Sequence, residues 1–428
     1  MLKLKNKFLG LYSQVVGSIA FYPSLVTLFF VVLAVLMLQI ENYGISKYVT
    51  DKVQYIIVNN KDTARTILTT IVGGVMSIMV FSFSMVMLLL SQASSNFSPR
   101  VLPSLIANKK HQLVLGFFIG TIVYCLLVTM NILPDHRSYS VPGVATFVGV
   151  ILGLHCLALF VYFLHSISRS IQIGYILETL YKTTLQRIEE EIDTMHHRVE
   201  QLPDDSNWEN LYSNKTGYLQ DIVEQHLKEL AEEHETSIHI LVEEGRFIIE
   251  GEVVGKVERD LDATARDMIV SCLLFSSEER IAQNLVYGIK QITEIIVKAM
   301  SPGINDPGTA LIGIDYLSEL FIKRMHLPDN KLFQKNGSQL EVGIREATFE
   351  HIFYLSMVSI RQYVRHDVVV ILKLIDLFKS LLKTDGLRKD KEKFLRKELA
   401  SLMEDVKAHI KNTSDQEYLV KLGAAITK

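Results

Sequence analysis

The sequence lacks the short motifs that mark most nucleotide-driven, hydrolytic and redox enzymes. It has no Walker loop, no GxSxG, no HExxH, no GxGxxG and no CxxC pair. No pair of carboxylates can be assigned to acid–base chemistry from spacing alone. We therefore expect a protein that is not an enzyme, that holds no metal or cofactor, and that does not itself drive transport with ATP.

Cysteine and net charge are also scarce. Cys125 and Cys156 lie in apolar segments and Cys272 is far away in the sequence, so no disulfide framework is predicted and a reducing compartment is expected for the polar part. The formal net charge is only -3, which gives no support for nucleic-acid binding.

Apolar residues are abundant but unevenly distributed. They make up 49% of the 428 residues, with a mean hydropathy of +0.23, and the excess lies almost entirely before Leu164. An apolar helix needs about 20 residues to cross a bilayer. Four such segments can be drawn, which predicts a multi-pass membrane protein whose first span is an uncleaved anchor: 21–40, 67–90, 113–133 and 141–164.

The orientation follows from Lys and Arg near the span ends, which are enriched on the cytoplasmic side. Eight lie on the side of the N-terminus and five on the other side. Both termini are therefore predicted to be cytoplasmic, in a bacterial inner membrane, with residues 41–66 as the only sizeable external loop.

A hydroxyl group recurs at every seventh residue around the second span. Because a helix advances about 100° per residue, a step of seven drifts only about 20°, so these side chains form one slowly winding stripe. Polar groups in a membrane face a neighbouring helix or water rather than lipid. The stripe is either a packing face of small residues or the lining of a water path. Its members are Thr63, Thr70, Ser77, Ser84, Ser91 and Ser98.

The second span ends in a polar segment, residues 91–100. Pro99 disfavours helical geometry at the residue before it, so the helix is expected to continue to about Asn96. Ser95, with Gln92, Asn96 and Arg100, could line the cytoplasmic mouth of a pore. Alternatively, the segment is an interfacial helix end whose serines bond to their own backbone.

Glycine pairs at i, i+4 spacing occur in the third and fourth spans. Gly116 and Gly120 form one pair, and Gly149 and Gly153 the other. Such residues let helix backbones approach closely, and we expect this packing inside one subunit rather than between subunits.

The remaining chain is charge-rich. A helical stalk is predicted over 165–202, a helix over 219–233, and strands over 237–242, 246–250 and 253–257; everything after about Asp260 is predicted helical, including 281–300 and 388–410. The expected fold class is a mainly α membrane protein with four transmembrane helices, followed by a cytoplasmic α+β domain with a small β unit and a helical C-terminal part. The corresponding divisions are 1–20, 21–164, 165–202, 203–260 and 261–428.

One loop, residues 301–310, combines polar and helix-starting residues. Asp306 as N-cap and Pro307 as first helical residue account for it structurally. The functional alternative is that Asn305, Asp306 and Thr309 bind an ion or polar ligand.

Three parts of the chain together resemble a family of bacterial predicted membrane proteins, domain of unknown function 2254. They are the region ending in SSNFSPR at 94–100, the pair 216–220 and 245–247, and the region 280–310 that contains SPGINDP. The sequence departs from the family pattern at Ser166 and Asn284. The resemblance implies a bacterial inner-membrane protein and supplies no activity.

The leading hypothesis is an oligomeric channel or pore-like transport protein for ions or small solutes, a homo-oligomer in the lipid bilayer. The second span would line the path through Thr70, Ser77, Ser84, Ser91 and Ser95, and the cytosolic domain would assemble or gate it. The alternative is a membrane-anchored sensor or scaffold whose cytosolic domain binds a ligand or protein partner.

Overall fold

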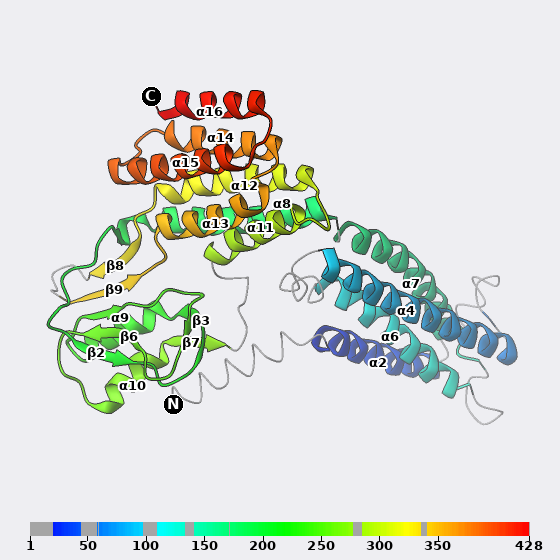
Figure 1. The fold of residues 1–428 in the computed structure, drawn as a ribbon. Coiled ribbons are helices and arrows are strands. Elements are labelled where there is room, and N and C mark those ends of the chain that lie inside the picture. Colours follow the sequence, from blue (N-terminus) through cyan, green and yellow to red (C-terminus); the bar gives the residue numbers. More distant parts are fainter. Residues whose placement is uncertain are drawn as a thin grey trace. The chain divides into compact units, whose positions relative to one another are not determined.

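The computed structural model describes residues 20–43, 58, 60–96, 109–132, 141–170, 172–276, 285–334 and 340–427. The chain forms two compact units, Met1–Gln172 and Ile173–Lys428, each of which is described here by itself (Figure 1). The first is the membrane unit and the second is the α+β unit. The fold class predicted from the sequence is confirmed.

The described part of the membrane unit consists of four helices: α2 (Phe21–Asn42), α4 (Lys61–Asn96), α6 (Lys109–Met130) and α7 (Gly143–Ser170). All four are long and apolar enough to cross a membrane, as predicted. The helix α4 continues through residues 91–96, which confirms the expectation that the second span extends beyond its apolar run.

Helix α6 lies at the centre of this unit. Half of its most apolar segment is buried in the subunit, against 11% for α4. A Cβ atom added at Gly120 would lie only 2.7 Å from Phe30 of α2, and one at Gly149 of α7 would lie 2.8 Å from Leu68 of α4. The glycine pairs therefore allow close packing inside one subunit, which confirms the prediction.

The helices of the α+β unit begin at α8 (Ile173–Asp193). The predicted stalk helix was expected to stop near residue 202, but α8 ends at Asp193 and is followed by the 3₁₀ turn Met195–His197 and by strand β1 (Arg198–Val199). Arg198, just after this turn, places its guanidinium group in a buried ion-pair network. The other helices are α9 (Glu224–Glu233), α10 (Ala263–Ser271), α11 (Leu285–Ala299), α12 (Pro307–Met325), α13 (Phe349–Val364), α14 (Val368–Leu382), α15 (Lys389–His409) and α16 (Thr413–Thr427).

Side-chain caps fix several helix starts. Asp262, Thr348 and Asp367 accept hydrogen bonds from the backbone N–H three residues on, at α10, α13 and α14, which satisfies donors that have no partner in the helix. The predicted amphipathic C-terminal helix is present as α15. It buries one stripe and leaves the opposite side to solvent, and that stripe is the predicted one: Leu395, Leu399, Leu402 and Val406.

Two sheets lie next to the layer formed by α8 and α11–α16 (Figure 1). The larger has the order β1-β8-β9-β4-β6-β2 and the smaller the order β5-β3-β7; in the larger sheet β4 pairs with β9 in parallel and all other pairs are antiparallel. Their strands are β2 (Glu209–Tyr212), β3 (Gly217–Ile222), β4 (Ile238–Ile240), β5 (Phe247–Ile248), β6 (Val253–Val257), β7 (Leu273–Ser276), β8 (Asn330–Gln334) and β9 (Glu341–Arg345).

Two predictions about this region are wrong. Residues 219–222 belong to strand β3, not to the start of a helix, and β7, β8 and β9 interrupt the region after Asp260 that was predicted to be all helical. The strand β8 has a partner nearby in the sequence, β9, but β7 and β9 also pair with distant strands: β7 pairs with β3, and β9 pairs with β4 about a hundred residues earlier, as in Ile344 with Ile240. Such pairing overrides weak local propensities.

Candidate functional site: the outer face of α4

The helix α4 has two faces of different character. Leu68, Val75 and Ser82 are buried against the rest of the membrane unit. Two residues further along the helix in each case, Thr70, Ser77 and Ser84 are exposed on the subunit. A step of two residues is about 200° around a helix, so the predicted hydroxyl stripe lies opposite the packed face.

The inner face of α4 is fixed by contacts with α7. A Cβ atom added at Gly153 of α7 would lie 3.0 Å from the Ile71 side chain of α4. One added at Gly149 would lie 2.8 Å from the Leu68 side chain. Because this packing determines which way α4 is rotated, the stripe cannot turn inward without losing it. The hydroxyls are thus not a packing face inside the subunit.

The hydroxyl protons of the two central members of the stripe, Ser77 and Ser84, are already used in hydrogen bonds. Ser77 donates to the carbonyl of Gly73 at 2.9 Å, and Ser84 donates to the carbonyl of Val80 at 3.0 Å. Each oxygen retains acceptor capacity directed away from the backbone. At these two residues the outer face therefore presents weak acceptors without an unsatisfied donor, which suits contact with water, with cations or with a second helix.

Small residues accompany the stripe. Gly73 and Gly74 are exposed, and a Cβ atom at either would meet nothing within 4 Å. No described residue of the subunit therefore occupies the space that these glycines leave open. A glycine pair beside a row of hydroxyls is a surface that another transmembrane helix can approach closely.

The predicted mouth is only partly described. Ser91 is exposed, and the helix runs on to Asn96. The side chains of Gln92, Ser95 and Asn96 lie outside the described residues, as does Arg100. Their assignment to a cytoplasmic mouth stays a prediction.

The loop before α12 has the geometry of a helix cap. Asp306 accepts hydrogen bonds from the N–H of Thr309 at 3.1 Å and from its hydroxyl at 2.5 Å, and Pro307 begins the helix. Asn305 adopts a φ of 49°, a left-handed conformation that asparagine tolerates. This cap accounts for Asp306 and Thr309, while the exposed Asn305 and Asp306 side chains keep acceptor capacity, so ligand binding by this loop stays a prediction.

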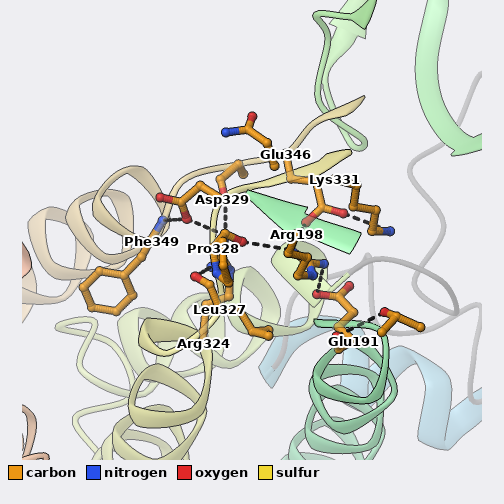
Figure 2. A network of polar contacts seen from close by, with 12 residues as sticks. Glu191, Arg198, Arg324, Leu327, Pro328, Asp329, Lys331, Glu346 and Phe349 are labelled. Atoms are coloured by element: carbon orange, nitrogen blue, oxygen red, sulfur yellow. Dashed lines mark hydrogen bonds and ion pairs between the residues drawn. The ribbon is translucent and has the colours of Figure 1, made fainter. Parts of the chain in front are cut away.

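A buried ion-pair network, missed by the sequence reasoning, lies where α8 meets β1, β8 and β9 (Figure 2). The Arg198 guanidinium, with no exposed side-chain surface, donates to Glu191 and to Glu346, both at 2.8 Å, and to the carbonyl of Pro328 at 3.0 Å. Lys331 lies between Glu346 at 3.0 Å and Glu224 at 2.9 Å.

These contacts set the charge states of the two central acids. Burial alone would raise the pKa of Glu346, but Lys331 and Arg198 outweigh it and hold that pKa below its usual range. Burial raises the pKa of Glu191, and the neighbouring Glu346 raises it further. The network ties helices to sheet, and we assign it a structural role because every cation in it is already paired.

A second polar cluster surrounds His239 on β4. Its buried ring lies between the carboxylates of Asp205 at 3.1 Å and Glu341 at 3.2 Å, and Trp208 packs 4.2 Å from its centroid. Lys256 pairs with Asp205 at 3.0 Å. The sequence signal that could have indicated this cluster is a histidine between two isoleucines, Ile238 and Ile240, inside a predicted strand. Within the described residues no group of three or more His, Cys, Asp or Glu side chains could hold a metal ion.

Comparisons with known proteins identify similar sequences. A family profile described as "Predicted membrane protein (DUF2254)" matches residues 17–380. Uncharacterized proteins of Mycobacterium bovis and Mycobacterium tuberculosis are each 26% identical over 332 residues, which is 74% of this chain and 63% of the relative. The matched region thus spans less than two thirds of the length of these curated relatives. No solved structure matches the chain.

Proposed function

Since the chain belongs to the DUF2254 family of predicted membrane proteins, we propose that it forms a homo-oligomeric channel or pore-like transport protein for ions or small solutes in a bacterial inner membrane. In this proposal both termini are cytoplasmic. Copies of α4 surround the path, and the α+β unit assembles or gates it.

The observation that carries the proposal is the exposure of the hydroxyl stripe on the subunit. Ser77 and Ser84 lie on the face of α4 opposite to Leu68 and Val75. An isolated subunit would present this polar stripe to lipid, where polar groups rarely face. Placing α4 helices around a common axis would instead direct the hydroxyl oxygens toward water. In a hydroxyl-lined path such oxygens replace part of an ion's hydration shell.

A second function is favoured by a different observation. Because Ser77 and Ser84 donate to their own helix carbonyls, this part of the stripe can also pack dry against α4 of another copy without leaving either donor unsatisfied. The oligomer would then be a membrane-anchored scaffold or sensor whose α+β unit binds a ligand or protein partner.

Ion flux from proteoliposomes distinguishes the two functions. We expect the wild-type protein to release K⁺ or Cl⁻, followed with ion-selective electrodes, and Ser84→Leu to lower that release about tenfold or more because leucine replaces an acceptor oxygen with apolar bulk. The matched control is Met76→Leu, which changes an exposed α4 residue about 100° around the helix from the stripe.

The outcome against conduction is equally clear. A wild-type oligomer that releases neither ion, or a Ser84→Leu variant with undiminished release, would favour the scaffold or sensor. Oligomeric state in detergent is measured in parallel, so that loss of flux by dissociation is separated from blockage of an intact path.

A further inference from the structure

The α+β unit contains a cavity of about 570 Å³ between the turn 243–246 and helices α11 and α13. This volume lies in the range of small-molecule sites, roughly 300–1,000 Å³. Apolar side chains form much of the wall, among them Ile289, Ile352 and Leu355. The cavity can therefore enclose a compound that has a hydrocarbon part, and its polar groups determine which compound.

Three hydroxyls on the wall are acceptors rather than donors. Thr293 donates its proton to the carbonyl of Ile289 at 2.9 Å, Ser356 to that of Ile352 at 3.0 Å, and Ser359 to that of Leu355 at 2.8 Å. Each oxygen keeps lone pairs for a ligand but has no further proton to give. A ligand that donates hydrogen bonds suits this wall better than one that accepts them.

Glu244 gives the cavity an acidic group without a direct ion pair. Its carboxylate makes no hydrogen bond or ion pair with any described residue, although it lines both this cavity and the small space beside the ion-pair network. Lys331 is paired with Glu224 and Glu346, and Arg246 with Glu252. Lys331 and Arg187 favour the ionised form of Glu244 only from a distance, since Arg187 is itself paired with Glu190, and burial outweighs them.

We propose that the cavity binds an organic cation, a primary ammonium or guanidinium compound with an apolar spacer, whose charged group pairs with the Glu244 carboxylate. The acceptor oxygens of Thr293, Ser356 and Ser359 take the remaining N–H donors, and the apolar wall covers the spacer. This site belongs to the α+β unit alone and does not depend on whether the membrane unit conducts.

Proton release should accompany binding. Burial raises the pKa of Glu244 to about 8, so in the empty cavity at pH 7 the carboxyl is mostly protonated, and a bound cation favours its ionised form. Affinity should therefore rise as pH increases from 6.5 to 8.5. The charged and titratable groups that face Glu244 across its surroundings are Arg187, Glu191, Asp221, Glu224, Glu243, Arg246, Lys290, Glu294, Arg324, Lys331, Arg345, Glu346 and His351.

Titration calorimetry on the full chain in detergent tests the proposal with spermidine and agmatine as probes. We expect saturable binding that tightens about tenfold between pH 6.5 and 8.5, with an observed heat that changes with the ionisation enthalpy of the buffer. E244Q should weaken binding about tenfold or more and abolish the buffer dependence. The matched control E250Q removes an exposed carboxylate nearby that does not line the cavity, and it should bind as the wild type does.

A second variant guards against a folding defect in E244Q. Ser359→Ala removes one acceptor oxygen from the wall and should weaken binding about threefold, with an unchanged unfolding temperature. Absence of saturable binding by both probes, equal binding by E244Q and wild type, or binding of succinate in place of the cations would each overturn the proposal.

Discussion

Helices α6 and α4 both carry small and polar residues in apolar spans, but they use them in opposite ways. On α6, Gly120 faces Phe30 closely and the buried Thr121 hydroxyl lies 3.2 Å from the Cys156 sulfur. On α4, Gly74 meets nothing within 4 Å and Ser84 is exposed. The same residue types thus stabilise the subunit in one helix and remain available to other molecules in the other.

This difference teaches that small residues in a span do not reveal their partner by themselves. What decides is the face on which they lie relative to the large side chains, since those fix the rotation of the helix. Leu68 and Val75 direct α4 toward its own subunit and leave the hydroxyls outside. The following variants probe the comparison in order of decreasing effect.

Gly120→Leu should destabilise the membrane unit by about 3 kcal/mol or more, because even a Cβ atom would lie 2.7 Å from the Phe30 ring and overpacking costs roughly 1–3 kcal/mol for smaller insertions. Gly74→Leu is the matched control, since its added side chain enters open space. Unfolding in detergent under conditions that keep the protein monomeric measures both. Equal destabilisation would show that α4 has no free outer face.

Removing a hydroxyl should give a smaller contrast. Thr121→Val deletes a buried hydroxyl next to the Cys156 sulfur, and we expect a loss of about 1 kcal/mol, the usual net value of a hydrogen bond. Ser84→Ala deletes a hydroxyl that bonds only to its own helix and should change the monomer by less than about 0.5 kcal/mol. The same unfolding assay is used, and a larger effect at Ser84 than at Thr121 would contradict the assignment of faces.

In the α+β unit, the paired Glu346 and the unpaired Glu244 should respond oppositely to pH. Burial raises the pKa of Glu244 to about 8, so the folded state binds its proton more tightly and the contribution of this group to stability decreases as pH rises from about 4.5 to 8. For Glu346, Lys331 and Arg198 outweigh burial and lower the pKa. The contribution of Glu346 to stability is therefore lost as the pH falls below the usual pKa of a glutamate.

The readout is the difference in unfolding free energy between wild type and each variant across pH 4 to 9. The Glu244→Gln variant should gain stability relative to wild type as the pH rises toward 9. The Glu346→Gln variant should lose stability relative to wild type, and this loss should be larger at neutral pH than at pH 4. Parallel curves for the two variants would mean that pairing does not separate these acids.

Much of the fold was readable from the sequence because its signals are local. The four spans follow from apolar length, the buried stripe of α15 from its periodicity, and the Asp306 cap from a polar residue before a proline. Strand β8 was missed although its partner β9 follows it closely, whereas β7 and β9 were missed because their partners β3 and β4 are distant in the chain. The Arg198 network was missed for the same reason, since Glu191, Lys331 and Glu346 converge only after the sheet forms.

The candidate site was half readable. The spacing of Thr70, Ser77 and Ser84 predicted that they share a face, and α4 being a helix confirms the spacing argument. Whether that face would pack inside the subunit could not be read from α4 alone, because it depends on which side α7 covers. Gly149 and Gly153 fix that choice by packing against Leu68 and Ile71, which lie about eighty residues earlier in the sequence.

The central claim, that the hydroxyl stripe meets water, is tested most directly by the reactivity of cysteines placed on α4 in liposomes. A charged, water-soluble methanethiosulfonate reagent reacts with the cysteine thiolate, which forms only where water reaches the side chain. We expect rapid modification of Ser77→Cys and Ser84→Cys, and slow modification of Met76→Cys, which is exposed about 100° around the helix from Ser77, and of Val75→Cys on the buried face. Protection of Ser77→Cys and Ser84→Cys to the level of Val75→Cys would contradict the account.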